Sequence, residues 1–103
     1  MKSFLIKYRF QNGSEETWRH DIAQFIAALD SDPALQGKIS YRCMKNRDGS
    51  DYYHLATVVD DETVKALQSR SFFQTYTEKT KRAGGGAVEV VPLDLIAETK
   101  RSA

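Results

Sequence analysis

Hydrophobic and polar residues alternate along the first segment of the chain, from residue 3 to residue 11. The apolar positions of this alternation are Phe4, Ile6, Tyr8 and Phe10. Only Leu5 departs from the pattern, because it adds an apolar side chain to the polar face. A period of two residues is typical of a strand with one buried face. The pattern therefore predicts a half-buried strand, followed by a turn at Asn12-Gly13.

The hydrophobic period lengthens to that of a helix after Ser14. The apolar stripe of this helix consists of Trp18, Ile22, Phe25, Ile26 and Leu29. Ser14 is a favourable N-cap, and the two glutamates that follow it suit the positive end of the helix dipole. Asp32-Pro33 predicts the end of the helix, because a residue before proline disfavours helical backbone angles. Gly37 marks the bend into the next strand.

Two more alternating segments, 38–45 and 52–59, surround the dipeptide Asp48-Gly49. Asp-Gly is typical of a type I′ hairpin turn, in which both central residues need a positive φ. A two-residue loop at this dipeptide fixes which residues oppose each other, and a four-residue loop gives the same faces. A three-residue loop would turn one strand over.

This register divides the side chains of the hairpin between two faces. His54 lies opposite Cys43 and Tyr41 opposite Ala56, on a face apolar enough to meet the helices. The reverse face carries Met44, Tyr53, Arg42, Leu55, Ser40 and Thr57. That face is too apolar to be left in water and too polar for a monomer core. We therefore predict that it packs on a second copy, giving a homodimer through the sheet face.

The second half of the chain repeats the helix and strand signals. An aspartate pair at 60–61 begins a helix whose apolar rhythm is interrupted near Ser71, which predicts a helix with a break or kink. The aromatic residues that resume the rhythm are Phe72, Phe73 and Tyr76. Three glycines at 84–86 end the helix. The last strand is predicted over 87–97, where Pro92 indicates an edge position or a bulge.

The order strand-helix-strand-strand-helix-strand predicts an α+β, ferredoxin-like fold. Two right-handed crossovers joined by a hairpin build a four-stranded antiparallel sheet with both helices on one face. The chain has 103 residues, which suits one domain over 1–103. Residues 98–103 are predicted to form a frayed tail.

Composition narrows the classes of partner. Lys and Arg number 15 against 14 Asp and Glu, and this balance gives no electrostatic case for nucleic acid. No segment approaches the ~20 apolar residues that span a bilayer, so we predict no membrane partner. Cys43 is the only cysteine, which fits a reducing cytoplasm and excludes an intrachain disulfide. We predict no metal and no cofactor, and the glycines at 84–86 follow a helix, unlike a phosphate loop.

Three stretches of the sequence carry a resemblance to a known family. They are 54–62 (HLATVVDDE), 69–76 (SRSFFQTY) and 88–93 (VEVVPL). The chain, over about residues 3–99, resembles the dimeric α/β-barrel (ferredoxin-like) superfamily, particularly the antibiotic-biosynthesis-monooxygenase-like group. The resemblance implies two sheets that face each other in a dimer, and a cavity between each sheet and its own helices.

The same resemblance bears on activity. Members of the superfamily include cofactor-free oxygenases that act on electron-rich polyketide phenols, haem-degrading enzymes, isomerases and proteins without a demonstrated reaction. The haem-degrading members use an Asn-Trp-His set. Here the only tryptophan, Trp18, lies in the first predicted helix and the second predicted helix has no histidine. This departure counts against haem.

His54 is the main candidate for chemistry, beside Tyr41 and Cys43. An imidazole of near-neutral pKa could take a phenolic or enolic proton, and the resulting carbanion could react with oxygen. The alternative is a core histidine that is hydrogen-bonded to a tyrosine or a carbonyl. The candidate ligand-orienting and pocket-lining residues are Tyr8, Trp18, Cys43, Phe73 and Tyr76. Aromatic residues at helical spacing are more often core, and a lone cysteine is more often an inert hydrophobe.

Three functions follow. The first is a cytoplasmic, cofactor-independent monooxygenase or isomerase of an aromatic or enolisable small molecule, with His54 and Tyr41 as catalytic residues. The second is a non-catalytic dimer of the same fold that binds a small aromatic ligand or has a structural role. The third is a single-strand RNA binder, which ranks last because segment 51–57 is neither basic nor glycine-bearing.

Overall fold

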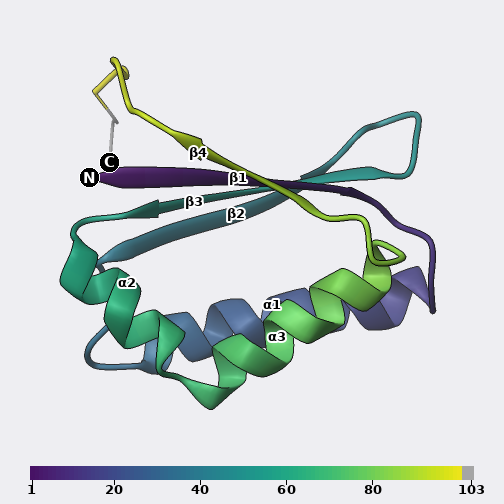
Figure 1. The fold of residues 1–103 in the computed structure, drawn as a ribbon, viewed down its shortest axis with the longest axis horizontal. Coiled ribbons are helices and arrows are strands. Elements are labelled where there is room, and N and C mark those ends of the chain that lie inside the picture. Colours follow the sequence, from purple (N-terminus) through teal and green to yellow (C-terminus); the bar gives the residue numbers. More distant parts are fainter. Residues whose placement is uncertain (101–103) are drawn as a thin grey trace.

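The computed structural model describes residues 1–100, which form one antiparallel sheet with helices on one of its faces (Figure 1). The elements in chain order are β1 (Lys2–Arg9), α1 (Glu15–Ser31), β2 (Ile39–Lys45), β3 (Asp51–Val58), α2 (Asp61–Gln68), α3 (Ser71–Ala83) and β4 (Glu89–Leu93). The strands are ordered β2-β3-β1-β4. This arrangement confirms the predicted ferredoxin-like fold. No helix of the described residues is both long and apolar enough to cross a membrane.

The register of the β2–β3 hairpin is the predicted one, since Cys43 opposes His54. The turn itself differs from the prediction. Asn46 closes the hairpin through a 2.8 Å bond from its N–H to the Asp51 carbonyl, so the loop has four residues. Gly49 donates its N–H to the Asn46 carbonyl, and it is not among the glycines of positive φ. The prediction of a type I′ turn at Asp48-Gly49 was therefore wrong, but an even loop length preserves the faces.

The second predicted helix is two helices, as the interrupted apolar rhythm indicates. α2 ends at Gln68 and α3 begins at Ser71, with Arg70 in an extended conformation between them. The Arg70 guanidinium bonds to the Asp32 carboxylate at 2.6 Å. Asp32 is the extended C-cap residue of α1, immediately before Pro33. This ion pair ties the break between α2 and α3 to the end of α1.

The core lies between the sheet and the helices. The buried face of α1 consists of Trp18, Ile22, Phe25 and Leu29, at the spacing of one helical stripe. α1 begins at the predicted cap, where the Ser14 hydroxyl accepts the Thr17 N–H. The remaining predicted stripe residue, Ile26, is only half-buried. The buried cluster is completed by Tyr8, Leu35, Tyr52, Tyr76 and Ala83.

β4 is an edge strand, as Pro92 indicated, and it is shorter than predicted. It spans Glu89–Leu93 instead of 87–97. The end of the strand has a geometric reason, because Leu93 opposes Ser3 and β1 begins only one residue before Ser3. Residues 98–100 of the predicted tail belong to no helix or strand, and residues 101–103 lie outside the described residues.

The sheet face opposite the helices has an apolar centre. Val91, Leu5 and Leu55 lie beside one another across β4, β1 and β3. This row explains why Leu5 departs from the alternation of its strand, since its neighbours on the outer face are also apolar. The rows on either side are more polar, with the pair Ser3 and Thr57 hydrogen-bonded at 3.0 Å.

Candidate functional site

The sheet and the helices enclose a cavity of about 360 Å³. Strand residues on its wall include Ile6, Tyr41, His54, Ala56 and Val90, and helix residues include Phe25, Leu67, Phe73, Tyr76 and Lys81. The wall is mainly apolar. This volume lies at the lower end of the range of small-molecule sites, roughly 300–1,000 Å³.

His54 lies at the centre of a buried chain of hydrogen bonds. Its Nε2 atom is 2.7 Å from the Tyr8 hydroxyl, and its Nδ1 atom is 2.6 Å from the Tyr41 hydroxyl. The Trp18 indole donates to the Tyr8 oxygen at 2.7 Å, and the Tyr41 and Tyr76 hydroxyls are 2.8 Å apart. The His54 side chain is 0% exposed. The hydroxyls of Tyr41 and Tyr76 therefore lie between the imidazole and most of the cavity.

The hydrogen-bond partners assign the tautomer of His54. An indole N–H only donates, so the Tyr8 oxygen accepts from Trp18 and the Tyr8 proton goes to Nε2 of His54. Nε2 is then the acceptor and Nδ1 carries the proton, which it donates to Tyr41. Tyr41 in turn donates to Tyr76. The opposite tautomer would leave the Tyr8 proton without an acceptor.

Burial keeps every member of this chain uncharged. It lowers the pKa of His54 from 6.5 to about 4, because the imidazolium would lose its hydration. It raises the pKa values of Tyr41, Tyr76 and Tyr8 well above that of a free phenol. The sequence predicted an imidazole whose pKa lies near neutral pH, and burial instead moves the pKa of His54 well below that range. At neutral pH, His54 is a neutral group with all its hydrogen bonds made.

Solved structures of known proteins share this arrangement of strands and helices. A mutant of SnoaB, described as a cofactor-independent oxygenase from Streptomyces nogalater, superposes with a TM-score of 0.77 at 13% identity, covering 97% of each chain. Rv0793 from Mycobacterium tuberculosis gives 0.76 at 11% identity, covering 96% of this chain and 98% of its own. A protein described as an antibiotic biosynthesis monooxygenase gives 0.75 at 8% identity, covering 94% of this chain and all of its own.

The chain has the antibiotic biosynthesis monooxygenase-like fold. The resemblance expected from the sequence is thus confirmed at the level of the fold. Neither the scan against family models nor the search of curated proteins found a match.

Within this antibiotic biosynthesis monooxygenase-like fold, the predicted site residues divide into two groups. His54, Tyr41, Phe73 and Tyr76 all belong to the cavity wall. The other three predicted residues, Tyr8, Trp18 and Cys43, do not line it. Tyr8 and Trp18 instead lie behind His54, where Tyr8 bonds to Nε2 of His54 and Trp18 donates to Tyr8.

The position of Cys43 gives no support to a nucleophilic role. It is half-buried and opposes His54 across the hairpin. Burial raises the pKa of its thiol to about 11, so the group stays protonated at neutral pH. Cys43 is best described as a small apolar side chain beside the buried chain of hydrogen bonds.

Some wall residues were missed from the sequence. The wall residues contributed by α3 are Phe73, Tyr76, Thr77, Thr80 and Lys81, and those contributed by α2 are Val64, Leu67 and Gln68. Both sets follow the three-and-four spacing of a single helical face. Extending that spacing beyond Phe73 and Tyr76 would have found Thr77, Thr80 and Lys81.

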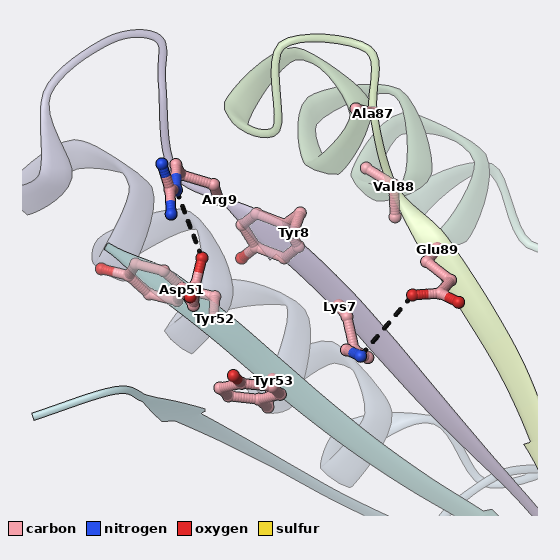
Figure 2. A pocket seen from close by; sticks show the side chains of 9 residues that line it. All are labelled: Lys7, Tyr8, Arg9, Asp51, Tyr52, Tyr53, Ala87, Val88 and Glu89. Atoms are coloured by element: carbon pink, nitrogen blue, oxygen red, sulfur yellow. Dashed lines mark hydrogen bonds and ion pairs between the residues drawn. The ribbon is translucent and has the colours of Figure 1, made fainter. Parts of the chain in front are cut away.

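A second, larger hollow of about 590 Å³ lies at the other end of β1 (Figure 2). Its charged side chains pair with one another, Arg9 with Asp51 at 3.4 Å and Lys7 with Glu89 at 3.6 Å. Arg9 therefore pairs within its own chain. The hollow is also lined by Tyr8 and Tyr52, whose side chains are buried, and by the half-buried Tyr53. Among its described lining residues, each charged side chain already has a partner.

Metal binding finds no support in the described residues. Among residues 1–100, no three His, Cys, Asp or Glu side chains gather closely enough to hold a metal ion. His20 lies on the exposed side of α1.

Proposed function

We propose that the protein binds a small, mostly apolar molecule in the cavity between the sheet and the helices. The observation that carries this proposal is an apolar cavity of about 360 Å³ in a chain of only 103 residues. Close packing leaves few voids larger than a water molecule in an ordinary core. A space of this size is therefore typical of a binding site, and burial of an apolar ligand there is favourable.

The phenol hydroxyls at the inner end supply the polar part of the site. Tyr41 donates to the Tyr76 oxygen, so within the described residues the proton of Tyr76 itself is left with the Cys43 sulfur, a weak acceptor. A ligand oxygen, such as that of a phenol or a ketone, would satisfy it. This requirement favours an aromatic or enolisable ligand over a hydrocarbon.

A second candidate function is cofactor-independent monooxygenation of such a ligand. Two observations favour it: the fold shared with the oxygenase SnoaB, and the contact of Tyr41 with both the cavity and His54. A ligand proton would pass through Tyr41 to Nδ1 of His54, which can accept it once the imidazole proton has moved to Nε2, and the resulting carbanion would give its electrons to O₂. The ligand carbon would lose two hydrogens and keep one oxygen atom, and the other oxygen atom would leave with those hydrogens as water.

The lowered pKa of His54 makes that proton transfer costly. Moving a proton from a phenol of pKa about 10 to an imidazole of pKa about 4 costs roughly 8 kcal/mol. A turnover of about 10 per second corresponds to a barrier of roughly 16 kcal/mol, so the transfer does not exclude catalysis. Pairing of the imidazolium with the new ligand anion would reduce the cost.

Oxygen uptake separates the two functions. Purified protein is mixed with a panel of electron-rich phenols, and ligand binding and O₂ consumption are measured for the wild type, Tyr41→Phe and Tyr53→Phe. An enzyme should consume O₂, and Tyr41→Phe should abolish uptake while the outer-face control Tyr53→Phe retains it. Ligand binding without O₂ consumption above that of buffer would contradict the oxygenase function and support only the binding function. Absence of binding by every phenol would contradict both.

We also propose that the outer sheet face forms the homodimer contact predicted from the sequence. The apolar row of Val91, Leu5 and Leu55 supports this, because each side chain is only half-buried in the single chain. A stable dimer needs about 800 Å² of contact on each partner, which a whole sheet face can supply. Sedimentation equilibrium should find dimers for the wild type and monomers for Leu5→Glu. Monomers at every wild-type concentration would refute the proposal.

A further inference from the structure

One side chain on the cavity wall carries a charge at neutral pH, and it is Lys81. The other charged residues of α3 lie outside the wall, and His54 is neutral. Lys81 is exposed, as are Gln68 and Val90, which is 58% exposed although it also lines the cavity. The wall is therefore open to solvent at these residues, and we refer to the opening at Lys81 as the mouth of the cavity.

The spacing of α3 explains why this lysine and not its neighbours faces the cavity. Lys81 follows Thr77 by four residues, on the helical face that lines the wall. Lys79 points elsewhere and pairs with Asp21 at 3.6 Å. Among the described residues, Lys81 belongs to no ion pair, so its ammonium group is available to a ligand.

The end of α3 does not counteract this positive charge with free carbonyls. The N–H groups of the glycines at 84–86 donate to the carbonyls of Thr80, Arg82 and Lys81, at distances of 2.8 to 3.1 Å. Capped carbonyls present less of the partial negative charge of a helix C-terminus. An anion at the mouth would thus meet mainly the ammonium group.

We propose that Lys81 selects a ligand with a single acidic group, namely an apolar ring compound whose carboxylate or sulfonate lies at the mouth. The inference rests on the proposed binding function and adds the charge of the ligand. The mouth is the only part of the site where an anion keeps its hydration, because the wall within is apolar. Lys81 lies five positions after Tyr76 on α3, about 7.5 Å along the axis, a span suited to a body of one or two rings.

Two fluorescent dyes test the inference. They are 8-anilinonaphthalene-1-sulfonate and N-phenyl-1-naphthylamine, which share one skeleton and differ by the sulfonate. Dissociation constants are measured by titration for the wild type, Lys81→Gln and the matched control Lys79→Gln. Lys81→Gln should weaken the sulfonate roughly three- to tenfold, the value of a partly screened ion pair, and leave the neutral dye within about twofold. Lys79→Gln should change neither dye by more than about twofold.

The outcomes separate this inference from the binding function on which it rests. Equal weakening of the sulfonate by both lysine substitutions, or no weakening by Lys81→Gln, would overturn the role of Lys81 and leave the cavity as a binding site. Ala56→Leu and Thr77→Leu each fill part of the cavity and should weaken both dyes. Failure of both dyes to bind, or binding that neither filling substitution weakens, would overturn the binding function itself. Both lysines are exposed, so their substitution should not prevent folding.

Discussion

Among residues 1–100, the Tyr8 hydroxyl is the only hydrogen-bond partner of two buried groups, which makes Tyr8→Phe a sharp test of the hydrogen-bond chain. The substitution keeps the ring and removes one oxygen. That oxygen lies 2.7 Å from both the Trp18 indole nitrogen and Nε2 of His54. Its loss leaves a donor and an acceptor unpaired in the core, and the small gap that remains is too tight to hold a water molecule.

The expected cost follows from counting the groups that lose partners. A buried donor or acceptor without a partner costs about 1–3 kcal/mol. Two such groups give roughly 2–5 kcal/mol, after allowing for the hydroxyl of Tyr8 that no longer has to be desolvated. A domain of this size is stable by only about 5–15 kcal/mol. Tyr8→Phe should therefore remove a large part of the stability of the protein.

Urea denaturation followed by circular dichroism measures the effect. The midpoint should fall clearly for Tyr8→Phe with little change in slope, since the surface exposed on unfolding is nearly the same. Thr75→Val is the control, because Thr75 is exposed on α3 and its hydroxyl makes no hydrogen bond within the described residues. It should change stability by less than about 0.5 kcal/mol. A cost for Tyr8→Phe as small as that of the control would refute the assigned chain of bonds.

Three further predictions concern titration, packing and capping. Burial lowers the pKa of His54 from 6.5 to about 4, so between these pH values the unfolded state binds more protons than the folded state. About 3 kcal/mol of stability should therefore be lost as the pH falls from 6.5 to 4. Unfolding measured against pH should show this slope in the wild type and not in His54→Gln; equal slopes would contradict it. Gly84→Ala should cost about 1–3 kcal/mol in urea denaturation, because its Cβ atom would lie 2.9 Å from that of Tyr8, and a neutral result would show that the contact relaxes. Asp60→Ala should lower the thermal midpoint more than Asp61→Ala, since the Asp60 carboxylate caps α2 through the Thr63 N–H, and the reverse order would disprove the cap.

The fold could be predicted because the alternation of strand residues, the spacing of helix residues and the even or odd length of a loop are all properties of the sequence itself. The faces of the hairpin depend only on whether the loop is even or odd, so the face of His54 was predictable although the turn type was not. Asp48-Gly49 adopts another turn because the Asn46 side chain accepts the Asp48 N–H at 3.0 Å. That bond competes with the intrinsic preference of the dipeptide.

The buried chain of hydrogen bonds could be predicted only in part. Tyr41 and His54 belong to one hairpin, so strand pairing alone brings them close. Trp18 and Tyr8 reach His54 from α1 and β1, and their contact depends on how a helix packs on a sheet, which no local pattern specifies. The cavity is still harder to predict from the sequence, since it depends on which side chains fail to fill the space between the sheet and the helices.

Trp18, the single tryptophan of this chain, packs against the buried histidine and tyrosine at the inner end of the cavity. Its ring stacks 6.4 Å from that of His54 and 5.6 Å from that of Tyr76, measured between centroids. The protein therefore contains its own optical reporter, because the ultraviolet emission of an indole responds to the polarity and protonation of its immediate surroundings. Entry of a guest molecule or charging of the imidazole should register as a change in colour or intensity, without any label.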